Sequence, residues 1–245
     1  MLKVYWLVTA SALLSLSAVT VPDHRFTNPY PQTGFITERL SPAELEKWKS
    51  IERVVFAEDI ERQPSHPTLR NLWQWIETSG HTVYIEFIQL RGGTSCTAGL
   101  FSIERFDPLG SHHIAVIKLN LDSINLAYVG PETTKANGFI PFMGLEKEER
   151  YAEVLGHELS HAVHILTDLD RARLVEDSIQ ETNQMLLAFH RRRKSPAMES
   201  DLKHRLFKRD VLLKSLEHQA EEMERVVWQE LSSKPLSALR QAGRK

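Results

Sequence analysis

Gly-His-Glu-Leu-Ser-His stands at residues 156–161, inside a helical pattern that covers about residues 147–166. His157 and His161 are four positions apart, so both imidazoles lie on one face of a helix, one turn from each other. Their nitrogens can therefore reach one metal ion, and Glu158 beside it can take a proton from a water that the metal holds. The motif predicts a metal site that carries its own general base.

The residues around the motif divide the helix into an apolar side and a polar side. At 100° per residue the apolar side carries Leu155, Leu159, Ala162, Val163 and Leu166, and the polar side carries Glu153, His157, Ser160, His161 and His164. An ordinary solvated helix face has the same pattern, but the apolar strands and helices around it favour the metal interpretation. His164 is too far along the helix to share the ion with both histidines, so we expect it to support the site from outside or to be solvated.

The order of the expected elements predicts one α+β domain over residues 41–232. Ser41 is a capping residue, followed by a proline and by Glu44, which predicts a helix from residue 42 to about Ala57. The other expected elements are a helix over Pro67–Thr78, strands over 82–90, 98–104 and 113–121, a loop over 122–146, and helices over 147–166, 171–192 and 200–232.

The two ends of the chain differ from this domain in composition. An uncharged stretch at residues 4–21 follows Lys3, which predicts a signal peptide or an N-terminal membrane anchor over residues 1–22, although a buried helix has the same pattern. We therefore expect an exported protein, either secreted or periplasmic, or one anchored in a membrane by this segment alone. Residues 23–40 are interpreted as an extended linker, and residues 233–245 as a basic, polar tail.

Composition excludes several functional classes. The chain has 245 residues, 42% of them hydrophobic, and a formal charge of −2, so no clustered basic field for nucleic acid is expected. Cys96 is the single cysteine, which excludes an intramolecular disulfide framework and a multi-cysteine zinc cluster.

The motif resembles that of the zincin metallopeptidases. The resemblance implies a zincin-like fold, in which a small mixed or antiparallel sheet packs on the motif helix and the C-terminal part is helical. It also implies that His157 and His161 bind Zn²⁺ and that Glu158 is the catalytic glutamate. The edge strand before the helix, expected at His113 to Leu121, would line the substrate cleft. A protein or peptide substrate would lie antiparallel to that strand.

Two branches of the zincins fit poorly. The metzincin continuation is absent, because His164 stands where that pattern has glycine and Thr167 where it has the third histidine. Peptide deformylases add an upstream cysteine, and Cys96 follows a glycine-rich stretch. Their Glu-Gly-Cys and glutamine signatures are missing here.

The chain is more similar to the gluzincins, in which a glutamate on a later helix is the third ligand. Glu217-His218-Gln219-Ala220-Glu221 looks like the Glu-x-x-Ala-acid element of several gluzincins, including lethal-factor-type toxin peptidases. The resemblance implies Glu217 as ligand and Glu221 as the acid that orients a histidine and as the first substitute; Glu181 is a further alternative. Glu217 and Glu224 lie along the apolar stripe of the expected helix, with Glu221 at its edge.

The function expected from the resemblance is that of a zinc-dependent metalloendopeptidase, a hydrolase in which Glu158 is general base and then proton shuttle. Tyr128, Tyr151 and His164 are considered as oxyanion donors, and the sequence places none of them. Two alternatives remain: an inactive zinc-binding fold of the cell envelope, and a helical interaction module whose partner contact is formed by Val227, Trp228 and Leu231.

Overall fold

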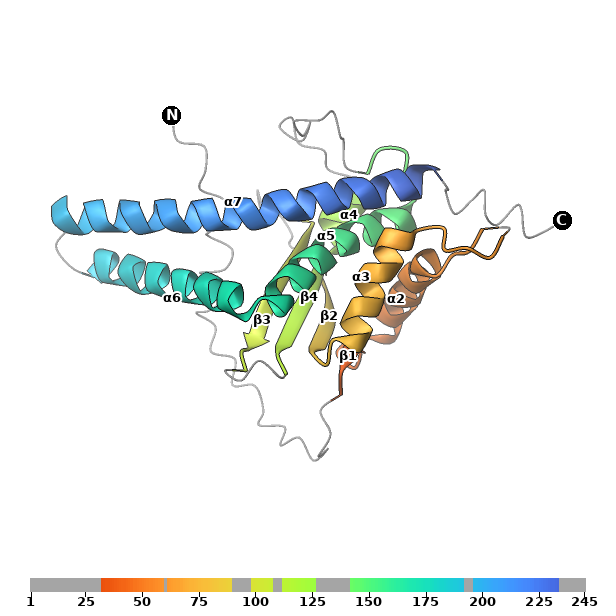
Figure 1. Ribbon diagram of the computed structural model, residues 1–245, viewed down its shortest axis with the longest axis horizontal. Helices are drawn as coiled ribbons and strands as arrows, with labels where there is room; N and C mark the ends of the chain where they lie inside the picture. The colour runs from red at the N-terminus through yellow and green to blue at the C-terminus, as the bar shows by residue number, and fades with distance from the viewer. Residues whose placement is uncertain are drawn as a thin grey trace.

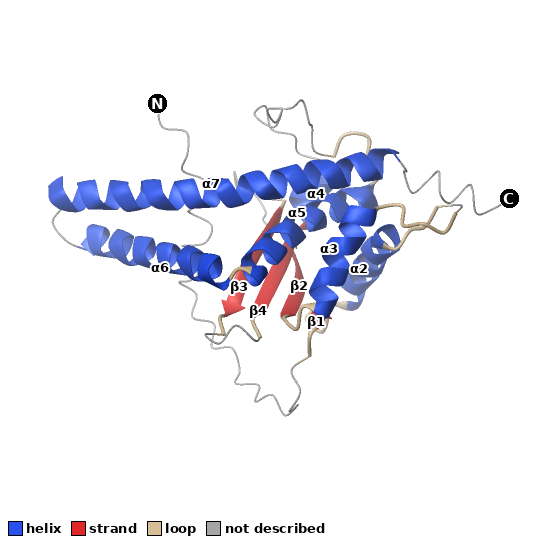
Figure 2. Cartoon of the chain, in the orientation of Figure 1, coloured by secondary structure: helices blue, strands red, loops and turns tan. Residues whose placement is uncertain are grey.

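The computed structural model describes residues 32–59, 61–89, 98–107, 112–126, 142–191 and 196–233. Within these residues four strands form one sheet, and the C-terminal part is helical (Figures 1 and 2). The α+β prediction is confirmed. The elements are β1 (Gly34–Ile36), α2 (Pro42–Val55), α3 (Pro67–Thr78), β2 (Thr82–Ile88), β3 (Gly99–Arg105), β4 (Ile114–Asn120), α4 (Leu121–Leu126), α5 (Lys147–Thr167), α6 (Leu169–Arg191) and α7 (Pro196–Ser233).

Local signals explain where the first helices begin. At the start of α2 the Ser41 hydroxyl accepts a hydrogen bond from the Glu44 amide at 3.4 Å, and the Glu44 carboxylate accepts one from the Ser41 amide at 2.8 Å. This capping box was predicted and satisfies two amides that the first turn leaves open. Helix α3 has its predicted bounds, with Pro67 at its first position.

The sheet is mixed, with the strand order β1-β2-β4-β3. Strands β1, β2 and β4 run parallel, and β3 runs antiparallel to β4. Strand β1 pairs residues 34–36 with β2, although the sequence analysis assigned them to a linker. A strand of three residues is too short to show an alternating pattern, so the prolines and glycines around it favoured the interpretation as a linker.

The expectation that residues 113–121 form the edge strand is wrong. Strand β4 lies between β2 and β3 and is mostly buried, whereas β3 is at the edge and ends in exposed residues. Strands covered on both faces are apolar along most of their length, as β4 is. Strand β3 lies beside α5, and no other described strand pairs with its second edge. The edge strand next to α5 is therefore β3.

Helix α5 lies across the sheet, and the C-terminal half of α7 packs on α5 (Figure 1). Leu155 and Leu159 of α5 are fully buried in one cluster with side chains of β2, β4 and α7. Gly156 allows the two helices to approach, because a Cβ atom there would lie 3.1 Å from a methyl carbon of Val227. This contact is one residue before His157, so it sets the distance from α7 to the motif.

Polar contacts also hold the C-terminal half of α7 in place. The Glu230 carboxylate accepts hydrogen bonds from the amide and hydroxyl of Thr68 at the start of α3, and Trp228 donates to the Met143 carbonyl at 3.1 Å. Val227 and Leu231 are fully buried. The surface assigned to a partner in the interaction-module alternative is thus largely occupied by the protein's own core.

Helices α6 and α7 lie side by side and extend past the edge of the sheet (Figure 2). Residues 122–126, expected in a loop, belong to helix α4, which begins at Leu121. No helix in the described part of the chain is long and apolar enough to cross a membrane. The predicted signal or anchor at residues 1–22, Cys96, Tyr128 and the tail from residue 234 lie outside the described residues.

Candidate metal centre

Two of the predicted ligands come from the middle of α5. His157 and His161 lie one turn apart, and their Nε2 atoms approach to 3.1 Å. Both side chains are largely buried, with 13% and 15% of their surface exposed. The two imidazoles therefore lie on one face of α5, as predicted, and their Nε2 atoms point toward the same place.

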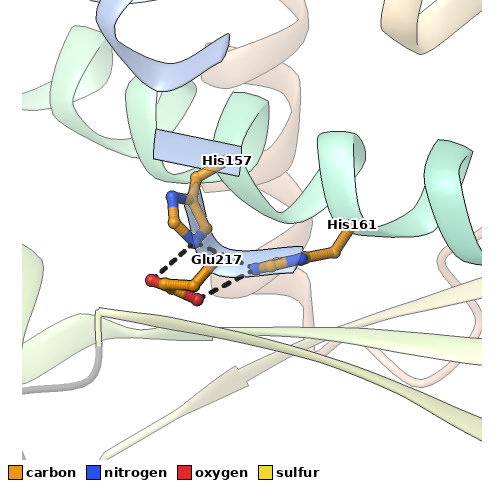
Figure 3. Close-up of side chains that lie close together, drawn as sticks. All are labelled: His157, His161 and Glu217. Atoms are coloured by element: carbon orange, nitrogen blue, oxygen red, sulfur yellow. Dashed lines mark hydrogen bonds and ion pairs between the residues drawn. The ribbon is translucent and has the colours of Figure 1, made fainter. Parts of the chain in front are cut away.

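The third side chain, Glu217, comes from α7. Its Oε1 lies 3.5 Å from His157 Nε2, and its Oε2 lies 3.4 Å from His161 Nε2. Figure 3 shows the carboxylate facing both imidazoles. One ligand atom from each residue lies within 4.8 Å of the other two, so His157, His161 and Glu217 form a group that could hold a metal ion.

The spacing of these atoms fits a tetrahedral ion. Bonds of about 2.0–2.1 Å in tetrahedral geometry place neighbouring ligand atoms about 3.3–3.4 Å apart. The two Nε2 atoms lie 3.1 Å apart, close to that value, and each of them has one oxygen of the Glu217 carboxylate nearby, Oε1 at 3.5 Å from His157 and Oε2 at 3.4 Å from His161. Two imidazoles and one carboxylate leave a fourth position open, as catalytic zinc sites do.

A second carboxylate of α7 orients His157, and it is not the one expected. Glu224 Oε2 lies 3.1 Å from His157 Nδ1, and only 6% of Glu224 is exposed. The sequence analysis chose Glu221 for this role. Glu224 is seven residues after Glu217, which is almost two full helical turns, so the two side chains lie on nearly the same side of α7. Glu221 is four residues after Glu217 and is rotated about the helix axis in the opposite direction. Glu181 instead pairs with Arg205.

The charges of the group depend on each other. Burial lowers the pKa of His157, but hydrogen bonds to Glu217 and Glu224 outweigh it and raise this pKa to about 10. Burial raises the pKa of Glu217, but the two histidines outweigh it and hold this pKa well below its usual range. Without a cation between them, the ligands thus keep a proton on the imidazole side, and metal binding must release it.

The predicted general base is close to the ligands in sequence and buried in the fold. Only 4% of Glu158 is exposed, and burial raises the pKa of its carboxyl, while the positive charges of His157 and His161 lower it in part. Its side chain reaches Gly99, the first residue of edge strand β3. The sequence did not indicate this glycine as part of the site, because its contact with Glu158 arises only in the folded chain.

The residues considered as oxyanion donors have other roles where the structure describes them. Tyr151 is buried and donates a hydrogen bond to Asn125 at 2.9 Å, so it ties α5 to α4. His164 lies 3.3 Å from the Ser160 hydroxyl through its Nδ1. Neither belongs to the group that could hold the metal.

Comparisons with protein-family models, curated proteins and solved structures gave no significant match. The function therefore has to be argued from the group itself. Its parts are three converging ligand atoms, a carboxylate on the outer nitrogen of one histidine, and a buried acid next to the ligands in the chain.

Proposed function

We propose that this chain is a zinc-dependent metalloendopeptidase with a zincin-like active site. The convergence of His157, His161 and Glu217 into one group that could hold a metal ion carries the proposal. Two imidazoles and a carboxylate suit zinc, which prefers nitrogen and oxygen ligands in four-fold coordination. Glu158 adds the acid–base group that a purely structural zinc site does not need.

The residues around the proposed ligands also support a catalytic zinc site. Zinc ligands in proteins are generally held by outer hydrogen bonds that fix the imidazole and make it a better donor. Glu224 provides such a contact at His157 Nδ1. The nitrogen that would bind the ion, Nε2, is then the one that faces Glu217 and His161.

Bound zinc would supply Lewis acidity, which lowers the pKa of a water molecule and polarises the carbonyl of the peptide bond. Glu158 takes one proton from the attacking water and passes it to the amide nitrogen as the carbon–nitrogen bond breaks. The products are a carboxylic acid and an amine. Burial raises the pKa of the Glu158 carboxyl, so this carboxylate is a stronger base than an exposed one and is suited to accept and return a proton.

The edge strand supports a peptide as the substrate. Strand β3 is paired with β4 on one side, and no other described strand pairs with its second side. An extended peptide can add to such an edge through main-chain hydrogen bonds. Because Gly99 of β3 contacts Glu158, a peptide bound along β3 would pass close to the general base.

The test begins with the metal content of the full-length chain after exhaustive dialysis, measured by elemental mass spectrometry. We expect about one zinc per chain. A purified chain that holds no zinc, and takes up none when folded protein is exposed to it, would contradict the proposal.

Cleavage of fluorescein-labelled casein tests the enzymatic part, with Glu158→Gln as the matched variant. This substitution preserves size but removes the proton acceptor, so we expect zinc to remain and activity to fall by at least about 100-fold. Equal cleavage by the parent chain and the variant would reject Glu158 as the base. Zinc binding without cleavage of any peptide would identify a non-catalytic zinc protein instead.

A further inference from the structure

Gly99 occupies an inward position of the edge strand. Side chains alternate along a strand, so residues 99, 101 and 103 share one face. Phe101 and Ile103 pack against Ile165 of α5 and Leu216 of α7. Gly99 is the third position on the face that covers α5, and it alone has no side chain.

The space that a side chain at Gly99 would need is filled by Glu158. A Cβ atom built there would lie 2.5 Å from Glu158 Oε1, 2.7 Å from Cγ and 2.9 Å from Cδ. All three distances are below van der Waals contact, and all three atoms belong to the same side chain. The backbone of Gly99 adopts no positive φ, so local conformation does not require glycine at this position.

The backbones on both sides of this contact are held in place. The start of β3 is held by a hydrogen bond of 2.8 Å from the Asn120 amide to the Ala98 carbonyl, and Gly99 is in register with Leu119 of β4. On the other side, α5 is fixed against α7 at Gly156. The Glu158 carboxylate therefore lies between two fixed backbones.

We propose that Gly99 is a positioning residue, whose missing side chain lets the edge strand hold the Glu158 carboxylate in its place for proton transfer. The inference rests on the proposed function, because only a catalytic role for Glu158 makes its position matter for rate. It adds a requirement that the metal-binding motif does not contain: the residue at the start of β3 must leave room for the base.

Thermal unfolding of the full-length chain tests the contact without any substrate. We expect Gly99→Ala to lower the Tm by about 5 °C in the parent chain, because the new methyl group forces Glu158 or β3 to shift. In the Glu158→Ala background the three clashing atoms are gone, so Gly99→Ala should change the Tm by less than about 2 °C. An equal loss in both backgrounds would overturn the contact and the proposal with it.

Steady-state kinetics with a quenched fluorescent peptide that the parent chain cleaves tests the positioning. For zinc-loaded Gly99→Ala, below its Tm and normalised to zinc content, we expect kcat to fall about 100-fold, as for a base displaced by about 1 Å. KM should stay within about threefold, and zinc content should stay at about one per chain.

The outcomes separate this inference from the proposed function. An unchanged zinc-normalised kcat, or a fall that the loss of zinc accounts for, would overturn the positioning role. If the parent chain cleaves no peptide at all, the proposed function fails and so does the role in catalysis, while the unfolding experiment still reports whether Gly99 and Glu158 are coupled.

Discussion

The two halves of α7 are one continuous helix in very different surroundings. In the half that packs on α5, Val227 and Leu231 are fully buried. In the half beside α6, Phe207 and Val211 are 65% and 52% exposed, and the polar contacts include surface ion pairs such as that of Arg205 with Glu181. Burial of apolar surface stabilises far more than exposed ion pairs do. Leu202 is buried in the half beside α6 too, so the difference is one of degree: the helix is anchored mainly through its C-terminal half.

Glu217, the proposed third ligand, lies where the anchored half begins. Leu216 is almost fully buried, and Glu217 follows it directly. From there to Glu230 the helix contacts His157, Gly156, Met143 and Thr68 in turn. The metal group thus depends on the anchored half, and the half beside α6 should tolerate substitutions that the anchored half does not.

The largest expected effect comes from the same substitution in both halves. Val227→Asp places a charge in the core beside Gly156 and should destabilise the fold by at least about 4 kcal/mol. Val211→Asp adds a charge to an exposed position and should change the free energy of unfolding by less than about 0.5 kcal/mol. Urea unfolding followed by circular dichroism measures both. Similar losses in the free energy of unfolding for the two variants would contradict the difference between the two halves.

Removing the carboxylate of Glu217 from the anchored half should have the next largest effect, on metal affinity, and Glu181 of α6, beside the other half, provides the control. Glu217→Ala deletes a ligand, so we expect zinc affinity to fall by more than about 100-fold in competition with a chelator. Glu181→Ala removes a carboxylate that pairs with Arg205 and should leave the affinity unchanged. If both variants bind zinc as the parent does, Glu217 is not a ligand.

A smaller effect distinguishes Glu224 from Glu221. Glu224→Gln weakens the contact at His157 Nδ1 and should lower zinc affinity about 10- to 100-fold. Glu221→Gln is the matched control on the same helix, and we expect a change within about threefold for it. The reverse order of the two variants in a zinc titration would restore the role first assigned to Glu221.

The pH dependence of the metal-free chain should give the smallest shift. Because folding raises the pKa of His157 to about 10, its contribution to stability is complete below its unfolded value near 6.5 and is lost as pH rises toward 10. Glu217 has a lowered pKa, so its contribution is present above about 4.5 and is lost in acid. We expect the Tm of the chelator-treated chain to fall by a few degrees from pH 6.5 to 10. In Glu217→Ala this fall should be smaller, and a Tm that rises over this range would contradict the assignment.

Local sequence signals predicted most of the secondary structure. The Ser41 capping box and the proline at residue 67 predicted the starts of α2 and α3, and periodicity predicted the helices that became α5, α6 and α7. Strand order is not a local property, because it depends on which strands meet in space. The sequence therefore revealed the strands over 99–105 and 114–120 but not which of them forms the edge.

Some residues of the site could be predicted from the sequence and others could not, for a related reason. The helix period alone brings His157 and His161 together, and it placed Glu217 on the inward stripe of its helix. The choice between Glu221 and Glu224 depends on how α7 crosses α5, and that crossing depends on the packing of Gly156 against Val227. Gly99 meets Glu158 only through the fold, so no short-range pattern could indicate it.

The place of α7 in the chain has a consequence for biosynthesis. Glu217 and Glu224 belong to the last described helix, so the ribosome makes them after all other parts of the site. A growing chain that already contains His157, Glu158 and His161 still lacks Glu217, the proposed third ligand, and Glu224, which contacts His157. The metal centre can therefore be completed only when synthesis has passed α7, and shorter nascent chains carry the motif without the finished site.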